Sequence, residues 1–278
     1  MCHTKSRALT CFAVLTAAFA MTVAAVPTAG AEGIYDLSAP VAPQVSASQV
    51  SPSQPFVLAV LMDRDRRGSP YANSHTHVGA TGLVRCGNRV GTAQLVLRRD
   101  IIVTAAHVLF GSGDHGDCVF LPRMGSGEPI AIETATIQAG SRTPLSQAAT
   151  RDWAVARLAA PVSAATPYVL GAQMSQPGAI TLCAAGNGGA TQFGAENCTV
   201  RSIGRTAGDG VRELAIDCSG SPGGSGGAII AENGAITGIY VGDRSTNPSE
   251  AQPYSKTHYN FGITIEGAFR RALLAQAH

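Results

Sequence analysis

The chain has 278 residues, of which 45% are hydrophobic and 14% are charged. This composition excludes a disordered chain, and the length allows one large all-β domain or two smaller packed units. The formal net charge of +2 gives no electrostatic reason to expect nucleic acid or an anionic membrane as a partner.

The first 31 residues have the order of a secretory signal peptide. Lys5 and Arg7 precede an uncharged run over residues 8–26, and small residues follow at 29–31. A membrane anchor is the rival interpretation, but the run is rich in Ala and Thr and poor in Leu and Ile, which favours a cleaved signal. We predict cleavage after Ala31, and so a secreted protein, extracellular or periplasmic, with no stable membrane association. Cleavage would leave 18 of the 20 basic residues against 18 acidic residues.

Residues 32–55 contain four prolines and five serines, which is typical of a linker or a propeptide. From Phe56 onward, short apolar runs rich in Val, Ile and Thr alternate with turn residues, as in an all-β barrel or sandwich. The runs are 56–62, 91–106, 118–123, 130–137, 153–158, 179–185, 198–203, 212–217, 227–231, 234–242 and 261–265. Residues 266–278 have helical spacing, so we predict a C-terminal helix there.

Two residues with acid–base chemistry stand beside such strands. His107 follows an apolar run and two alanines in "DIIVTAAHVLF", and Asp152 precedes the run "WAVARL". Taken alone, each fits an ordinary structural role, a hydrogen-bonded core histidine and a solvated turn aspartate. An aspartate beside the single tryptophan, Trp153, is nevertheless expected to be partly buried, and a buried carboxylate needs a partner.

Ser225 lies between glycines in "GSPGGSGGAII". Glycines allow positive φ angles, so the backbone can turn its N–H groups toward one point, as the stabilisation of an oxyanion requires. An ordinary glycine-rich turn is the alternative. A phosphate-binding loop is disfavoured because the stretch lacks a Gly-Lys-Ser/Thr ending and does not lead into a helical pattern.

The chain order His, Asp, Ser separates this set from two other common triad orders. "VTAAH", "RDWAVARL" and "GSPGGSGGAI" resemble the motifs of chymotrypsin/trypsin-like serine proteases, and the bacterial secreted branch with its glutamyl endopeptidases in particular. The resemblance extends from about residue 80 to the end. It implies an all-β fold of two perpendicular six-stranded antiparallel β-barrels with a C-terminal α-helix. The N-terminal barrel would take residues 56–163 with His107 and Asp152, and the C-terminal barrel residues 164–278 with Ser225.

The resemblance also implies residue roles. Ser225 would attack the scissile carbonyl, His107 would take its proton, and Asp152 would orient the imidazole. The backbone N–H groups of Gly223 and Ser225 would form the oxyanion hole. We therefore predict a secreted serine endopeptidase that acts on protein or peptide substrates as a monomer, with no cofactor and no metal.

The motifs depart from the animal members of the family at two positions. Gly224 stands where those members carry an aspartate that pairs with a newly cut N-terminus, so that activation switch is absent. Val108 replaces a half-cystine. We predict the disulfides Cys86–Cys118 and Cys198–Cys218 with Cys183 unpaired, although connectivity cannot be deduced from sequence alone.

The substrate pocket is expected to involve Ser219 and Tyr240. Ser219 lies where trypsin-like members place an acid, and Tyr240 lies where glutamate-specific relatives present a histidine. A neutral floor offers no counter-charge to Lys or Arg. We therefore predict a small-to-medium neutral or aromatic residue before the cut.

Two other function classes remain open. One is a non-catalytic binding module on the same fold, which an intact set of three reactive residues disfavours. The other is an esterase that uses the same serine and the same acyl-enzyme chemistry. An α/β-hydrolase is unlike this chain, because its residue order differs and its serine precedes a helix.

Overall fold

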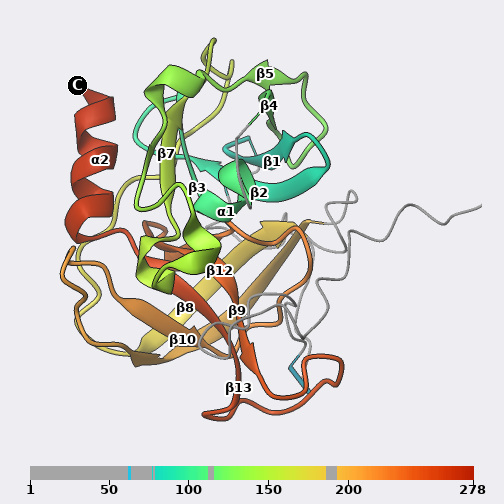
Figure 1. The fold of residues 1–278 in the computed structure, drawn as a ribbon, viewed down its shortest axis with the longest axis vertical. Coiled ribbons are helices and arrows are strands. Elements are labelled where there is room, and N and C mark those ends of the chain that lie inside the picture. The colour runs from blue at the N-terminus through green and yellow to red at the C-terminus, as the bar shows by residue number, and fades with distance from the viewer. Residues whose placement is uncertain (1–61, 64–76, 78, 112–115, 186–192) are drawn as a thin grey trace, which may run out of the picture. The chain divides into compact units, whose positions relative to one another are not determined.

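The computed structural model describes residues 62–63, 77, 79–111, 116–185 and 193–278. The predicted signal peptide and linker, and the predicted strand 56–62 apart from Met62, lie outside the described residues. The described chain is mostly β, with a seven-stranded sheet first and a closed six-stranded barrel second (Figure 1).

The N-terminal sheet has the strand order β5-β4-β1-β2-β3-β7-β6, and all its neighbours are antiparallel. Its strands are β1 Thr81–Cys86, β2 Arg89–Leu95, β3 Ile101–Thr104, β4 Cys118–Leu121, β5 Ile130–Ala131, β6 Gln138–Ala139 and β7 Ala154–Arg157. An antiparallel bridge between Ile132 and Leu158 joins the ends of β5 and β7, so the sheet curls back on itself. A six-stranded barrel was expected here. The curled sheet has seven strands because the segment between β4 and β7 adds two short edge strands, β5 and β6. Each has two residues, and turns and 3-10 helices make up much of the rest of the segment.

The C-terminal barrel confirms the predicted six strands. Its closed order is β10-β13-β12-β11-β8-β9. The strands are β8 Gly178–Ala185, β9 Phe193–Ile203, β10 Glu213–Ile216, β11 Ala228–Ala231, β12 Ile236–Ser245 and β13 His258–Thr264. Together with the curled sheet, this barrel gives the trypsin-like fold that the sequence motifs imply.

The helices among the described residues are few and short. They are α1 Ala106–Phe110, α2 Gly267–Ala277 and the 3-10 helices η2 Thr134–Thr136, η3 Pro144–Ser146 and η4 Ala149–Arg151. The C-terminal helix α2 matches the prediction and lies against the N-terminal sheet rather than only on its own barrel (Figure 1). Phe269 of α2 stacks on Trp153 with ring centroids 5.0 Å apart. The end of the chain therefore packs against β7 and against the residue that precedes this strand.

One apolar cluster runs through both sheets. It includes Val84 and Val103 of the N-terminal sheet and Ile230 and Ile263 of the barrel, all fully buried. A second cluster fills the barrel itself and includes Leu214 and Ile229. Buried apolar surface is the main favourable term in folding, so the two sheets are expected to depend on each other for stability.

Both predicted disulfides are present. Cys86 pairs with Cys118 between β1 and β4, and Cys198 of β9 pairs with Cys218 just after β10. Cys183 is buried and takes part in no disulfide among the described residues, also as predicted.

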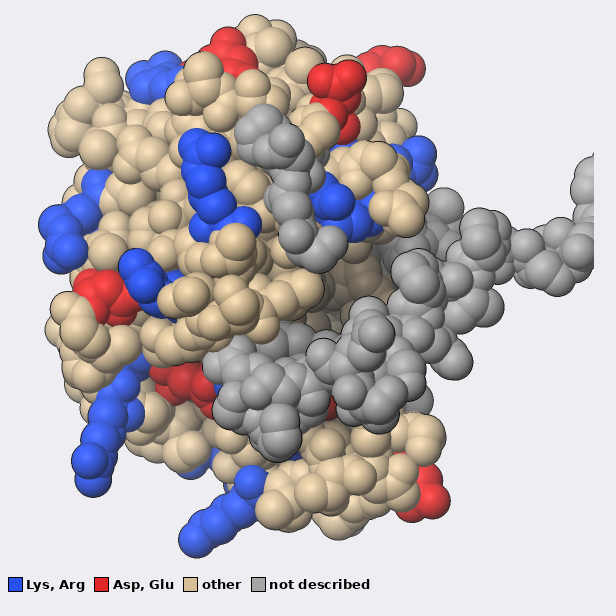
Figure 2. All heavy atoms as spheres, in the orientation of Figure 1, with Lys and Arg blue, Asp and Glu red and all other residues tan. Residues whose placement is uncertain are grey.

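The surface drawn in Figure 2 is mostly uncharged, with basic and acidic side chains scattered among neutral ones. No helix within the described ranges is both long and apolar enough to cross a membrane. The same ranges contain no group of three or more His, Cys, Asp or Glu side chains arranged to hold a metal ion.

Candidate active site

His107 lies at the start of a helical turn directly after a buried strand. Strand β3 is buried throughout, and Ala105 and Ala106, which connect it to the rest of α1, are fully buried. Their small side chains let the chain turn tightly at the edge of the core. The His107 side chain keeps 22% of its surface exposed, so the ring lies at the boundary between core and solvent.

Asp152 is brought to this histidine by the 3-10 helix η4. The chain leaves η4 at Asp152, whose side chain is completely buried. One carboxylate oxygen accepts a 2.8 Å hydrogen bond from the His107 backbone N–H, and the other lies 2.7 Å from Nδ1 of the ring. An ionised carboxylate only accepts, so Nδ1 carries the proton, and Nε2 of the neutral ring is left as the acceptor.

The pKa of His107 is subject to opposing influences. Burial lowers the pKa, because the protonated ring loses hydration, whereas the negative charge of Asp152 and its hydrogen bond raise it. The net result is a pKa above the ordinary value of histidine. The pair thus stabilises the imidazolium that a general base becomes when it takes a proton.

Two consecutive turns carry Ser225. In the first turn, Gly224 N–H donates to Ser221 O at 2.9 Å. Pro222 and Gly223 are its first and second central residues, and Gly223 has a φ of +88°. In the second turn, Gly227 N–H donates to Gly224 O at 2.8 Å. Ser225 and Gly226 are its first and second central residues, and Gly226 has a φ of +87°. A positive φ at the second central position is the mark of a type II turn, which requires glycine there. The glycines of "SPGGSGG" are thus placed by turn geometry.

The two N–H groups predicted to form an oxyanion hole have no backbone acceptor within the described part of the chain. Gly224 and Gly226 both donate, whereas Gly223 and Ser225 do not. In a trans peptide the N–H and the C=O point in opposite directions. Because Gly224 O accepts from Gly227, the N–H of Ser225 is directed away from the second turn.

The structure brings His107 and Asp152 into contact but does not join Ser225 to the ring by a hydrogen bond. Ser225 Oγ donates instead to Val241 O at 3.2 Å. The two segments nevertheless meet at Gly91 of β2. A Cβ on Gly91 would lie 2.4 Å from Val108 Cγ2 and 3.1 Å from Ser225 O. Val108 therefore fills space beside Gly91.

Strand β2 of the N-terminal sheet binds the two turns over residues 221–227, called the serine turns below. The sequence did not predict this contact. Thr92 N–H donates to Ser225 O at 2.7 Å, and Thr92 Oγ1 donates to Gly223 O at 2.8 Å. A Cβ on Gly226 would lie 2.0 Å from Thr92 O, so only glycine fits at this crossing. The sequence signal was weak because a polar residue in a strand usually faces solvent, whereas Thr92 is fully buried.

The two predicted pocket residues are both buried and linked through one neighbour. Tyr240 Oη donates to Asn260 Oδ1 at 3.0 Å, and Asn260 Nδ2 donates to the carbonyl of Cys218, next to Ser219, at 2.6 Å. Burial raises the pKa of Tyr240 well above its ordinary value, and the charge of Asp243 raises it further. This tyrosine is therefore a neutral hydrogen-bond donor at neutral pH.

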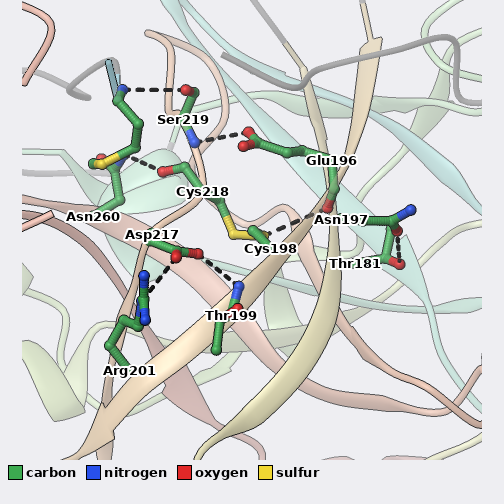
Figure 3. The surroundings of a disulfide bond; sticks show 11 residues. Thr181, Glu196, Asn197, Cys198, Thr199, Arg201, Asp217, Cys218, Ser219 and Asn260 are labelled. Carbon is green, nitrogen blue, oxygen red and sulfur yellow. Dashed lines mark hydrogen bonds and ion pairs between the residues drawn. A yellow bond between two sulfur atoms is a disulfide. The ribbon is translucent and has the colours of Figure 1, made fainter. Parts of the chain in front are cut away.

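Figure 3 shows that an acidic side chain lies beside Ser219. Glu196 of β9 is 1% exposed, and its carboxylate accepts the Ser219 N–H at 2.8 Å. Ser219 Oγ in turn accepts the backbone N–H of Met62 at 3.2 Å. Ser219 itself is neutral, as expected, but no local sequence pattern predicts that Glu196, 23 residues away, lies beside it.

Comparisons with known proteins agree with this fold. A family model described as trypsin-like peptidase domain matches residues 91–239, a little more than half of the chain. No curated protein sequence matches significantly.

Solved structures share the fold at low sequence identity. A Glu endopeptidase in complex with MPD is 15% identical with a TM-score of 0.60, over 78% of this chain and 99% of that one. The Rv3671c protease from M. tuberculosis in its active form is 18% identical with a TM-score of 0.53, over 81% and 93%. The thermostable serine protease AL20 from an extremophilic microorganism is 15% identical with a TM-score of 0.52, over 72% and 97%.

Proposed function

Because this chain belongs to the trypsin-like peptidase family of serine peptidases, we propose that it is a secreted endopeptidase with His107, Asp152 and Ser225 as its catalytic triad. It hydrolyses peptide bonds of protein or peptide substrates through an acyl-enzyme intermediate, as a monomer. The observation that carries the proposal is the Asp152 carboxylate, fully buried and 2.7 Å from Nδ1 of His107.

The chemistry follows from the three side chains. Ser225 Oγ attacks the scissile carbonyl while Nε2 of His107 takes the hydroxyl proton, so a bond to carbon forms and the carbonyl electrons move onto oxygen. The N–H groups of Gly223 and Ser225 stabilise that oxyanion. His107 then gives the proton to the departing amine, and water repeats the sequence to release the acid and restore Ser225. Rotation of the Ser225 hydroxyl from Val241 O toward His107 precedes attack.

We propose a preference for small-to-medium neutral or aromatic residues before the cut, with Ser219 and Tyr240 in the substrate pocket. The neutral Ser219 and the neutral Tyr240 phenol support this preference. Glu196, beside Ser219, is the acid that would account for cleavage after Arg. A peptide library tests it, and rapid cleavage after Arg would contradict the neutral preference.

Export is the remaining part of the proposal. Residues 1–31 act as a signal peptide and residues 32–55 as a linker or propeptide, ahead of catalytic segments at 56–163 and 164–278. Two disulfides support an oxidising compartment, because cytosolic reductants keep most thiols reduced. N-terminal sequencing of the exported protein would locate the processing site.

The test is labelling of purified mature protein with a fluorophosphonate probe, which reacts only with an activated serine. We expect the wild type to be labelled and Ser225→Ala to be unlabelled. Ser221→Ala, in the same turns, is the matched control and should keep labelling. Unlabelled, folded wild-type protein would instead support a non-catalytic binding module.

A further inference from the structure

A line of buried polar side chains lies behind the serine turns. Thr81, Gln94 and Tyr168 have no exposed surface. Thr81 and Gln94 face each other across β1 and β2 as a cross-strand pair. Buried polar groups must be satisfied by hydrogen bonds, so the partners of these side chains define what they do.

The hydrogen bonds of this line run in one direction. His77 N–H donates to Tyr168 Oη at 3.0 Å, and Tyr168 Oη lies 3.1 Å from Thr81 Oγ1. Thr81 Oγ1 donates to Gln94 Oε1 at 2.8 Å, which leaves Tyr168 as the donor to Thr81. Gln94 Nε2 then donates to Gly226 O at 3.3 Å. The last acceptor is the carbonyl of the residue that follows Ser225.

The direction also orients the Gln94 amide. Gly226 O can only accept, so it faces Nε2, and Oε1 is left to accept from Thr81. Stacking of His77 on Tyr168, with centroids 4.4 Å apart, fixes the far end of the line. A glutamine with both amide groups used and no exposed surface has little freedom to move.

We propose that Gln94 is a positioning residue for the nucleophile. It holds the Gly226 carbonyl, and with it the second turn, so that Ser225 keeps the backbone conformation required for attack. The inference rests on the proposed function, because it assigns a role toward the same serine. Thr92 fixes the carbonyls of Gly223 and Ser225 from the same strand, so Gln94 supplies the third point of attachment.

The test compares Gln94→Met with Gln276→Met. Methionine approximates the size of glutamine but makes neither amide hydrogen bond. Gln276 is the matched control, because it is also buried and bonded at both amide atoms, to Arg157 and Thr136, but lies in α2. Two quantities are measured, the maximal rate and half-saturation concentration of fluorophosphonate labelling, and hydrogen exchange of the peptide 218–230.

We expect Gln94→Met to lower the maximal labelling rate roughly tenfold or more with little change in half-saturation, and to speed exchange in 218–230. Gln276→Met should change neither quantity. If Gln94→Met does not fold, Thr81→Val removes the bond to Gln94 Oε1 with nearly the same shape and should give a smaller change of the same kind.

The outcomes separate the two proposals. Faster exchange in Gln94→Met together with unlabelled wild type would support the hold of Gln94 on the second turn and contradict the protease function. Unchanged exchange in Gln94→Met would overturn the positioning role, whatever the labelling. Equal effects of Gln94→Met and Gln276→Met on 218–230 would also overturn it, since both would then act through general destabilisation.

Discussion

At the residue scale, the Asp152 carboxylate decides how His107 titrates. Burial alone would lower the pKa of the ring, and Asp152 reverses that shift. A general base works only when neutral, so activity is lost as the pH falls through the His107 pKa. With that pKa above the ordinary value of histidine, the acid limb of the wild-type rate profile is expected above pH 6.5.

Asp152→Asn tests this argument. It removes the charge that raises the pKa but leaves the burial that lowers it, so the acid limb should move to lower pH. The maximal rate should fall on the order of 10⁴-fold, because an amide favours the wrong ring tautomer. The measurement is kcat/KM, or the second-order labelling rate, against pH.

The matched control for this change is Asp217→Asn. Asp217 is also a largely buried carboxylate that accepts a backbone N–H, from Thr199, and a side-chain donor, Arg201. Its replacement should leave the acid limb in place. A limb that stays fixed in Asp152→Asn would show that Asp152 does not govern the titration of His107.

At the element scale, the strands that the sequence predicts are those with long apolar runs. Strand β3, "IIVT", is apolar up to its last residue, and the first part of β12, "ITGIYVG", falls in the predicted run 234–242. Strand β1, "TGLVRC", was missed because only two consecutive residues, Leu83 and Val84, form its apolar run. The structure explains the two residues that precede this run: Thr81 donates a hydrogen bond to Gln94, and a Cβ on Gly82 would lie 2.3 Å from Leu121 O.

The C-terminal helix is an element whose role its own sequence does not reveal. Helical spacing predicts α2, but only the structure shows that Phe269 stacks on Trp153, the residue after Asp152. We expect Phe269→Ala to lower the free energy of unfolding by about 3–5 kcal/mol, because it leaves a cavity in a fully buried position. Chemical denaturation measures this loss.

Leu274→Ala provides the comparison on the same helix. Leu274 is 37% exposed, so its truncation should cost less than about 1 kcal/mol. Similar losses in both variants would indicate that α2 contributes through helix stability alone and not through its contact with Trp153.

At the scale of the whole molecule, the candidate site is assembled from both sheets. His107 and Asp152 lie in α1 and at the end of η4, between strands of the N-terminal sheet, and Ser225 lies in the turns that precede β11 of the barrel. Residue type, spacing and order predict these three as the candidate site. The supports were not predictable in the same way, because Thr92 and Gln94 meet the serine turns across more than 130 positions of sequence, and no local pattern encodes that contact.

The two disulfides divide between the sheets and should therefore differ in their effects. Closing loops of 32 and 20 residues, each is expected to contribute about 3–4 kcal/mol by restricting the unfolded chain. Cys198–Cys218 also ends next to Ser219, whereas Cys86–Cys118 joins β1 to β4 in the other sheet. Removing either pair as a double Cys→Ser change should lower stability by a similar amount.

The two disulfides should differ in their effect on substrate binding. Loss of Cys198–Cys218 loosens the residues that precede Ser219, so we expect a higher KM for peptide substrates and a changed preference at the residue before the cut. Loss of Cys86–Cys118 should leave both unchanged at a temperature where the variant remains folded. Denaturation curves and a peptide library measure the two effects. Equal changes in KM for both pairs would place the binding determinants away from Ser219, because the Cys86–Cys118 variant leaves the surroundings of that residue intact.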